Sequence, residues 1–174
     1  MRRLLEPSWV AKGSLCDLPL EVFLDQGIKG LVLDVDYTLL PRHSQVLPEC
    51  VVRWVHIARQ QLQLHLFSNN PNRRRIAAVA NSFDLPYTAG AGKPRRGPLR
   101  QVLEQLQLPG EQVALIGDRV FTDVLAGNRL GLFTVLVRPV AADGRPCPYD
   151  RLQRSERTIA RWCGARVDGG LPHS

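Results

Sequence analysis

The sequence predicts an α/β protein: a Rossmann-like, three-layer structure in which a parallel sheet of about five strands carries helices on both faces. Between about residues 28 and 137, short apolar runs alternate with segments that have helical spacing of apolar residues. This alternation is typical of β-α units and therefore of parallel strands. Polar residues follow several of the apolar runs directly, as expected where parallel strands end at a ligand-binding edge.

Local signals place the individual elements. Strands are expected at residues 30–36, 63–67, 85–89, 113–116 and 134–137, and helices at 19–26, 49–61, 72–83, 98–108 and 122–130. Prolines stand at or directly before four of the helix starts, and Gly27 and Gly131 are placed to end helices. We expect residues 1–27 to form an N-terminal extension with a short helix and residues 28–140 to form the core. Residues 141–174 are expected to be a tail with one helix near 150–162 and a frayed last ten residues.

Composition limits the protein class and its partners. The 174 residues, 44% of them hydrophobic, suit one domain. The net charge of +7, carried largely by arginine, indicates anionic partners. The four cysteines form no Cys-x-x-Cys pair, so we expect reduced thiols in an intracellular protein. Neither a signal-peptide core nor a membrane-spanning apolar run is recognisable, which predicts a cytoplasmic protein, at most peripheral to a membrane.

Two aspartates, Asp34 and Asp36, follow the first apolar strand, and Thr38 comes shortly after. An isolated Asp-x-Asp at a strand end is commonly a turn or a helix cap. The alternative is a functional pair, because two buried like charges call for a cation such as Mg²⁺. If the strand continues through Asp36, its period of two places both carboxylates on the same side. One could then act as a nucleophile and the other as a proton donor.

Other strand ends supply the remaining groups of a phosphoryl-transfer site. Such a site needs a nucleophile, cations for the equatorial charge and a proton donor for the leaving oxygen. Asp34 suits the nucleophile and Asp36 the acid and base, while Mg²⁺ and Lys93 supply positive charge. The expected phosphate-binding residues are Thr38, Ser68, Asn69 and Lys93, and Gly117-Asp118 with Asp123 completes the set.

In this order, the residues resemble the four motifs of the haloacid dehalogenase-like (HAD) phosphatases. The motifs are Asp34-Val35-Asp36-Tyr37-Thr38, Ser68, Lys93-Pro94 and Gly117-Asp118 with Thr122-Asp123, and the resemblance covers roughly residues 28–137. It implies that Asp34 becomes an aspartyl-phosphate and that Asp36 protonates the leaving group and then activates water. It also implies that Asp34, Asp118 and the backbone carbonyl of Asp36 bind Mg²⁺, while Asp123 supports the ligands from behind.

The resemblance can be narrowed to a capless subfamily. Residues 40–48 and 68–93 leave no room for the cap domain that many HAD enzymes insert there. The form Gly-Asp-Arg-x-x-Thr-Asp resembles the small YqeG-type phosphatases, whose relatives in mitochondria and plastids dephosphorylate phosphatidylglycerophosphate. Tyr37 departs from the asparagine common at that place, which weakens inference about the substrate but leaves the chemistry intact.

The leading hypothesis is therefore a Mg²⁺-dependent phosphomonoesterase, with a lipid headgroup phosphate as first substrate class and a soluble phosphate ester as the alternative. Arginines and the N-terminal segment around Trp9 are expected to attach the protein to an anionic membrane. A nucleic-acid-binding module is suggested by the basic runs at 73–75 and 93–96, but only 6% of residues are aromatic. We expect a solvated basic face for at least two of Arg73, Arg74 and Arg75, and no specific nucleic-acid partner. An inactive HAD-like scaffold is disfavoured because no catalytic residue is missing, and the sequence predicts no oligomeric state.

Overall fold

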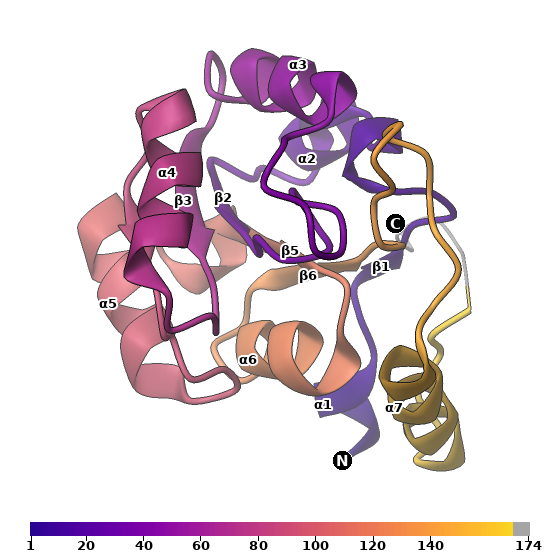
Figure 1. Cartoon of the computed structure of the whole chain (residues 1–174). Helices are drawn as coiled ribbons and strands as arrows, with labels where there is room; N and C mark the ends of the chain where they lie inside the picture. The colour runs from indigo at the N-terminus through magenta and orange to yellow at the C-terminus, as the bar shows by residue number, and fades with distance from the viewer. Residues whose placement is uncertain (169–174) are drawn as a thin grey trace.

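A single parallel sheet organises the computed structural model, which describes residues 1–168 (Figure 1). The six strands lie in the order β1-β6-β5-β2-β3-β4. Their bounds are β1 Trp9–Val10, β2 Gly30–Leu33, β3 Gln63–Phe67, β4 Tyr87–Thr88, β5 Val113–Gly117 and β6 Phe133–Leu136. The predicted α/β class is confirmed. The additional strand is β1, whose two residues pair with β6 and are too few to show an alternating pattern in the sequence.

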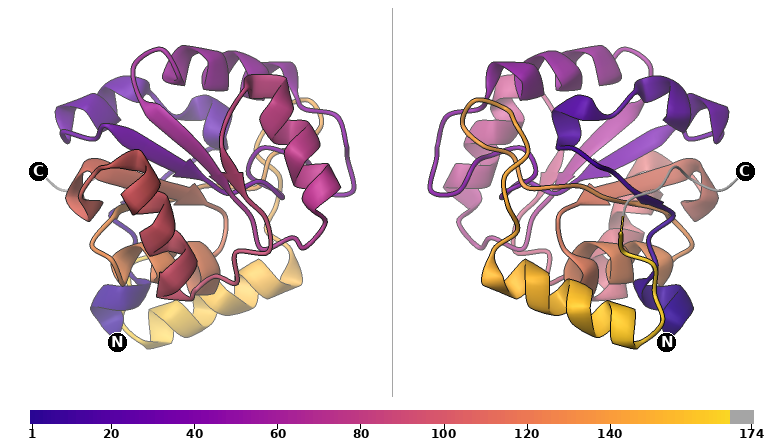
Figure 2. Two further views of the ribbon diagram at one scale, coloured as in Figure 1. Left: turned by 90° about the vertical axis from the view of Figure 1, so that its left-hand side faces the viewer. Right: turned by 90° about the vertical axis from the view of Figure 1, so that its right-hand side faces the viewer.

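Helices cover both faces of the sheet (Figure 2). The α-helices are α1 Arg2–Leu5, α2 Leu20–Asp25, α3 Glu49–Ala58, α4 Arg73–Phe83, α5 Arg96–Leu106, α6 Leu125–Asn128 and α7 Arg151–Trp162. Shorter helical turns are η1 Leu15–Asp17, η2 Gly110–Gln112 and the wide turn η3 Val120–Val124. The helix expected at 122–130 is thus divided between η3 and α6. Apolar side chains of α2, α3 and α4 share one core, and those of α5 and α6 share another.

The central strand β2 joins these two cores. Leu31 and Leu33 belong to the core under α2, α3 and α4, whereas Val32 belongs to the core under α5. All three side chains are fully buried, as the period of two requires for a strand covered on both faces. Removing side-chain volume from such positions typically costs about 2–5 kcal/mol. The residues that follow Leu33 therefore start from a rigid support.

The strand order brings three strand ends together. β2 lies between β3 and β5, and all three run parallel, so their carboxyl ends meet at one edge. The chain moves outward from β2 to β3 and β4 and then returns to β5 on the other side, which makes this edge a topological switch point. The chain is a loop at residues 34–48, and between β3 and Lys93 it holds only α4 and β4. No cap domain lies in either stretch.

Both terminal segments pack on the core. Trp9, in β1, is 6% exposed and contacts Phe23, with ring centroids 5.8 Å apart. The expectation that the segment around Trp9 is free to enter a membrane is therefore wrong, because β1 places this side chain inside the protein. The predicted C-terminal helix is confirmed as α7, which packs on η3 through Ala160. The fraying expected for the last ten residues falls mostly on 169–174, outside the described residues.

The cysteine expectation needs a correction. Cys16 and Cys50 form a disulfide, with Cα atoms 5.7 Å apart, while Cys147 and Cys163 are free. The pairing arises because η1 packs against α3. Sequence spacing does not reveal such a contact between residues 34 positions apart. As to membranes, none of the helices formed by residues 1–168 is both long enough and apolar enough to span a bilayer.

Candidate active site

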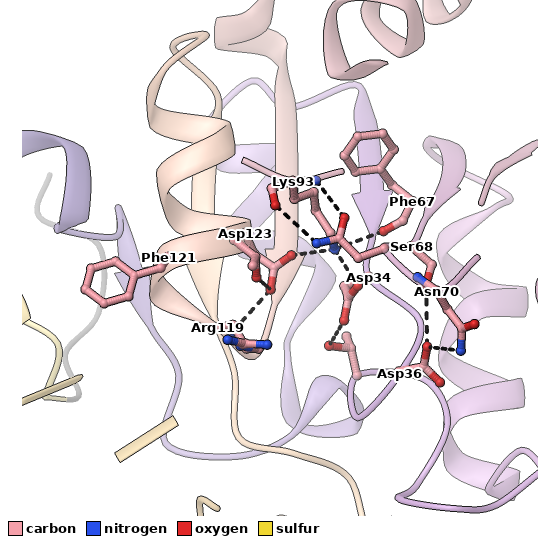
Figure 3. A network of polar contacts seen from close by, with 12 residues as sticks. Asp34, Asp36, Phe67, Ser68, Asn70, Lys93, Arg119, Phe121 and Asp123 are labelled. Atoms are coloured by element: carbon pink, nitrogen blue, oxygen red, sulfur yellow. Dashed lines mark hydrogen bonds and ion pairs between the residues drawn. The ribbon is translucent and has the colours of Figure 1, made fainter. Parts of the chain in front are cut away.

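The polar residues expected at the strand ends do meet at the switch-point edge (Figure 3). Asp34 follows β2, Ser68 follows β3 and Asp118 follows β5. Asp123 comes from the first turn of η3, and Lys93 from the loop before α5. The fold thus gathers residues that are up to 89 positions apart, from Asp34 to Asp123, at one place.

Three carboxylates form a buried cluster there. Asp34, Asp118 and Asp123 each offer an oxygen atom, and these oxygens all lie within 4.8 Å of one another. The three residues are at most 7% exposed. Carboxylate oxygens in such a group are the ligands that Mg²⁺ prefers.

Lys93 is the buried cation of the cluster. Its Nζ donates hydrogen bonds to Asp34, to Asp123 at 2.6 Å and to the carbonyl oxygen of Phe67 at 3.0 Å. These three acceptors satisfy all the donors of the ammonium group. Burial lowers the pKa of Lys93, but Asp123 and Asp34 more than offset this effect, so its pKa lies above the usual value and the lysine stays charged.

The cluster carries excess negative charge. Three buried carboxylates face one buried ammonium, a formal charge of about −2 when all are ionised. Burial is the main reason why the pKa of Asp34 rises to about 7; Lys93 opposes this rise and Asp123 adds to it. Burial, together with Asp34 and Asp123, also raises the pKa of Asp118 well above its usual value. A divalent cation would balance this charge, so the donor set fits one.

Asp123 supports the cluster from behind. Its Oδ1 accepts from Lys93, and its Oδ2 accepts from the backbone N–H of Arg119 at 3.1 Å and from the hydroxyl of Thr122 at 3.3 Å. Gly117 makes room for it, since a Cβ at that position would stand 2.3 Å from the Asp123 carboxyl carbon. Gly117 and Thr122, from the two halves of this motif, thus both contact the carboxylate of Asp123.

Two of the expected phosphate-binding residues contact Asp34 and Lys93. The buried Thr38 hydroxyl donates to Oδ2 of Asp34 at 3.4 Å. Asn69 uses its side-chain oxygen and nitrogen on the main chain of Lys93, at 2.6 and 3.2 Å. In this structure Asn69 fixes the loop that presents the lysine.

The carboxylate of Asp36 lies away from this cluster. The two carboxylates are expected on the same side if the strand continues through Asp36. Instead, β2 ends at Leu33 and the chain turns through Tyr37, whose φ is 69°. Asp36 instead faces the residues after β3. Its Oδ2 accepts from Asn70 at 3.1 Å and from Ser68 at 3.5 Å, and the guanidinium of Arg75 donates to Oδ1 at 3.0 and 3.3 Å.

Arg75 and Asn70 are site residues that sequence reasoning did not assign. Arg73 and Arg74 are exposed, as expected for a solvated basic face, whereas Arg75 is half-buried against Asp36. The sequence held one signal, because an arginine in the first turn of α4 opposes the helix dipole and so calls for another partner. Asn70 carried no comparable signal.

Helix α7 contributes two further contacts. The Gln153 side chain accepts from the backbone N–H of Asp150 at 2.8 Å, which caps the helix, and its amide nitrogen donates to Asp118 Oδ2. One turn on, Glu156 pairs with the guanidinium of Arg119 and accepts from the backbone N–H of Val120 at 3.1 Å. The C-terminal segment therefore holds the loop that carries Asp118. In the sequence, Asp150 and Gln153 indicate only a helix start.

Two open pockets border the site on either side of Tyr37. One, of about 550 Å³, is lined by Asp36, Asn70 and Arg75 among others. The other, of about 630 Å³, is lined by Asp118 and Gln153 and has a basic rim that consists of Arg42, Arg119, Arg151 and Arg154. This arrangement is suited to an anionic substrate that extends beyond the cluster.

Comparisons with known proteins agree with this geometry. A family model described as HAD-hydrolase-like matches residues 90–142, which include Lys93 and the motif of Asp118. YqeG of Bacillus subtilis (strain 168), named a probable phosphatase, is 30% identical over 133 residues that cover 75% of this chain and 77% of YqeG. The chloroplastic phosphatidylglycerophosphate phosphatase 1 of Chlamydomonas reinhardtii is 30% identical over 152 residues, and the match covers 78% of this chain and 54% of that protein. The chain thus spans about half of the algal relative.

Solved structures support the same fold. A HAD-superfamily hydrolase from Geobacter sulfurreducens PCA superposes with a TM-score of 0.52 at 15% identity, covering 66% of this chain and 93% of that one. An uncharacterized protein from Listeria monocytogenes serotype 4b superposes with a TM-score of 0.55 at 17% identity, and the match covers 72% of this chain and 85% of that protein. At such low identity these structures bear on the fold, while the relationship to YqeG covers most of both chains. With its acidic cluster and lysine in place, the chain belongs to the HAD-like phosphatases, the family of YqeG.

Proposed function

We propose that this phosphatase is a Mg²⁺-dependent phosphomonoesterase that works through an aspartyl-phosphate on Asp34. The observation that carries the proposal is the buried group of Asp34, Asp118 and Asp123 with Lys93 as its only buried cation among the contacts of residues 1–168. In this proposal Asp34, Asp118 and the backbone carbonyl of Asp36 hold the metal. When bound, Mg²⁺ supplies Lewis-acid stabilisation of phosphoryl charge.

The protein's own residues take the remaining roles. Asp34 attacks phosphorus, and Lys93 keeps its carboxylate oriented and adds positive charge beside the transferring group. Asp36 delivers a proton to the leaving oxygen and later takes one from the attacking water. Its three donors, Ser68, Asn70 and Arg75, hold its carboxylate in one orientation outside the buried cluster. In this proposal the Ser68 hydroxyl also binds a phosphoryl oxygen.

For the substrate we propose a phosphatidylglycerophosphate-like lipid headgroup. Support comes from the algal relative named for that activity and from the open, arginine-rimmed pocket next to Asp118. A headgroup with a second phosphate would offer the rim a further anionic group, and an uncapped site leaves space for a bulky lipid remainder. A small soluble phosphate ester is the alternative. We further propose that the protein works at a membrane surface as a peripheral protein.

The decisive experiment compares substrates on the purified protein. Release of phosphate is measured with Mg²⁺ from phosphatidylglycerophosphate in mixed micelles and from a panel of soluble phosphate esters. Asp34→Asn is the control for contaminating phosphatases. We expect turnover that EDTA abolishes, that Mg²⁺ restores and that Ca²⁺ does not support, with the lipid preferred in kcat/KM. Full turnover in excess EDTA would contradict the metal role, and equal kcat/KM for lipid and soluble esters would refute the lipid assignment alone.

A further inference from the structure

Helix α7 has an unusual distribution of side chains. Its buried positions are Gln153, Glu156, Arg157 and Ala160, so three of the four carry polar side chains. Its large apolar residues point outward instead: Leu152 is 53%, Ile159 42% and Trp162 81% exposed. Two of these polar residues are explained by the site, since Gln153 and Glu156 bind Asp118 and Arg119. The third, Arg157, donates to the carbonyl of Val167 and lies over the ring of Tyr149. Packing within residues 1–168 gives no reason for the exposed apolar ones.

The exposed apolar residues form a single stripe. Leu152, Ile159 and Trp162 are separated by seven and three positions, which places them along one side of an α-helix. We call the exposed side of α7 its outer face: at 100° per residue, Leu152 and Ile159 lie along one edge of it, Trp162 and Arg151 near its middle, and Arg154 and Arg161 along the other edge. Monomeric proteins rarely leave a stripe of large apolar residues exposed without a binding role.

The charge of the outer face has one sign. Its three arginines are all exposed, and the only carboxylate of α7, Glu156, is buried and paired with Arg119. Arg161 lies 3.5 Å from Asp168, while neither Arg151 nor Arg154 has a carboxylate partner in the described chain. A helix whose exposed side has an apolar edge, a tryptophan near the middle and an edge of arginines matches an interface that has an apolar interior and an anionic surface.

We propose that the outer face of α7 docks the protein on an anionic lipid bilayer, with Leu152, Ile159 and Trp162 entering the interface and the arginines binding phosphate headgroups. This inference rests on the proposed lipid-directed function. It also connects the membrane to the chemistry, because Arg151 and Leu152 line the pocket that contains Asp118. A headgroup at the bilayer surface would reach this pocket past the first turn of α7. A protein partner, whose interfaces are also enriched in tryptophan and arginine, is the alternative outcome of the vesicle experiment.

Vesicle binding tests the face directly. Co-sedimentation is measured with phosphatidylglycerol-containing and purely phosphatidylcholine vesicles, at low and high salt. The test variants are Ile159→Ser/Trp162→Ser and Arg151→Gln/Arg154→Gln. The matched charge control is Arg96→Gln/Arg100→Gln, in which both residues are exposed on α5, at the opposite side of the molecule in Figure 1. Trp162 also provides a signal, since Trp9 and Trp54 are buried and its emission should shift to shorter wavelength on insertion.

We expect binding to phosphatidylglycerol vesicles that weakens with salt. Each arginine removed from α7 should weaken it about fivefold, so about thirtyfold for the pair, because one basic residue near such a surface contributes about 1 kcal/mol. The α5 control should bind like the wild type, apart from a small long-range effect. Ile159→Ser/Trp162→Ser should lose binding and lipid turnover but hydrolyse a soluble ester at the wild-type rate, since neither residue lines the site.

Three results would overturn the docking proposal: no binding of the wild type to phosphatidylglycerol vesicles, equal binding to neutral vesicles, or equal losses in the α5 and α7 charge variants. Hydrolysis of the soluble ester tests the proposed phosphatase activity independently of membrane binding. If the wild type docks through α7 but hydrolyses neither ester nor lipid, the proposed function fails while the docking face stands. If the wild type hydrolyses both the soluble ester and the lipid but binds neither kind of vesicle, the docking proposal fails while the proposed function stands.

Discussion

Replacing Asp34 by asparagine should separate the chemical role of this carboxylate from its cost to stability. Asparagine has nearly the same shape but neither attacks phosphorus nor ionises. Lys93 would keep Asp123 and the Phe67 carbonyl as partners, so the buried ammonium stays paired. We therefore expect an intact fold, turnover reduced by several orders of magnitude, and, in the presence of a chelator, a more stable protein.

The size of the stabilisation depends on pH. The pKa of Asp34 is about 7 in the folded protein and 3.8 ordinarily, so between these values the folded state binds more protons than the unfolded state. The wild type without metal then loses stability as pH rises from about 4 through 7. Three pKa units correspond to about 4 kcal/mol, which is the upper bound of the effect. The asparagine variant is free of this loss. The difference in free energy of unfolding between the variant and the wild type should grow from near zero at pH 4 toward that bound at pH 8. At pH 8 this corresponds to a Tm about 10 °C higher for the variant.

Urea and thermal unfolding in EDTA at several pH values measure this difference. Subtracting the wild-type curve from the variant curve removes contributions from groups whose pKa does not depend on Asp34 and leaves those of Asp34 and its coupled neighbour Asp118. In saturating Mg²⁺ the wild type should gain about 2.7 kcal/mol at a hundredfold excess over Kd, whereas the variant, with one ligand oxygen fewer, gains less. Our account of the cluster is refuted if Asp34→Asn is less stable than the wild type in EDTA at pH 8, or if their difference does not change between pH 4 and pH 8.

Three further substitutions test other parts of the structure. Arg75→Gln should lower kcat about tenfold or more, because Asp36, for which we propose the acid–base role, loses the bidentate partner that positions it, while the exposed Arg73→Gln should match the wild type in steady-state assays. Burial lowers the pKa of His65 to about 4, so the His65 contribution to the free energy of unfolding should fall by up to about 3 kcal/mol as pH drops from 6.5 to 4, opposite in sign to that of Asp34; the stability difference between the wild type and His65→Gln in urea titrations should change by this amount. Gly117→Ala puts a Cβ 2.3 Å from a buried carboxyl carbon and should reduce both Tm and kcat, whereas Gly97→Ala, in helix α5, meets nothing within 4 Å and should leave kcat unchanged without lowering Tm.

Much of the site could be predicted because a parallel sheet makes position along the chain informative about position in space. Once each apolar run is identified as a strand, the residues directly after β2 and β5 must lie at the same edge. This reasoning correctly brought Asp34, Lys93, Asp118 and Asp123 together. It needed no knowledge of loop conformation, since these residues lie within or beside the regular elements.

The prediction fails where loop conformation decides the contacts. The direction of the Asp36 carboxylate depends on a turn at Tyr37 with positive φ, and strand period carries no information past the end of β2. Its partners Asn70 and Arg75 belong to the next loop and helix, and nothing in their spacing marks them as neighbours of an aspartate. The Cys16–Cys50 disulfide is unpredictable for the same reason, because it joins two elements outside the sheet.

Helix α7 shows a different limit. The spacing of apolar and polar residues indicates that its two sides differ, and the usual inference is that the apolar side faces the core. In α7 the polar side faces the core instead, because it supplies hydrogen-bonding partners to Asp118 and Arg119 in the loop after β5. Leaving such buried polar groups unpaired would cost more free energy than burying another leucine would gain. With Gln153 and Glu156 turned inward, the geometry of a helix turns Trp162 outward and leaves Leu152 and Ile159 at the edge of the buried side, where they are 53% and 42% exposed. Stabilising the active-site loop and exposing an apolar stripe are therefore two consequences of one orientation, and a variant that rotated α7 would be expected to lose both.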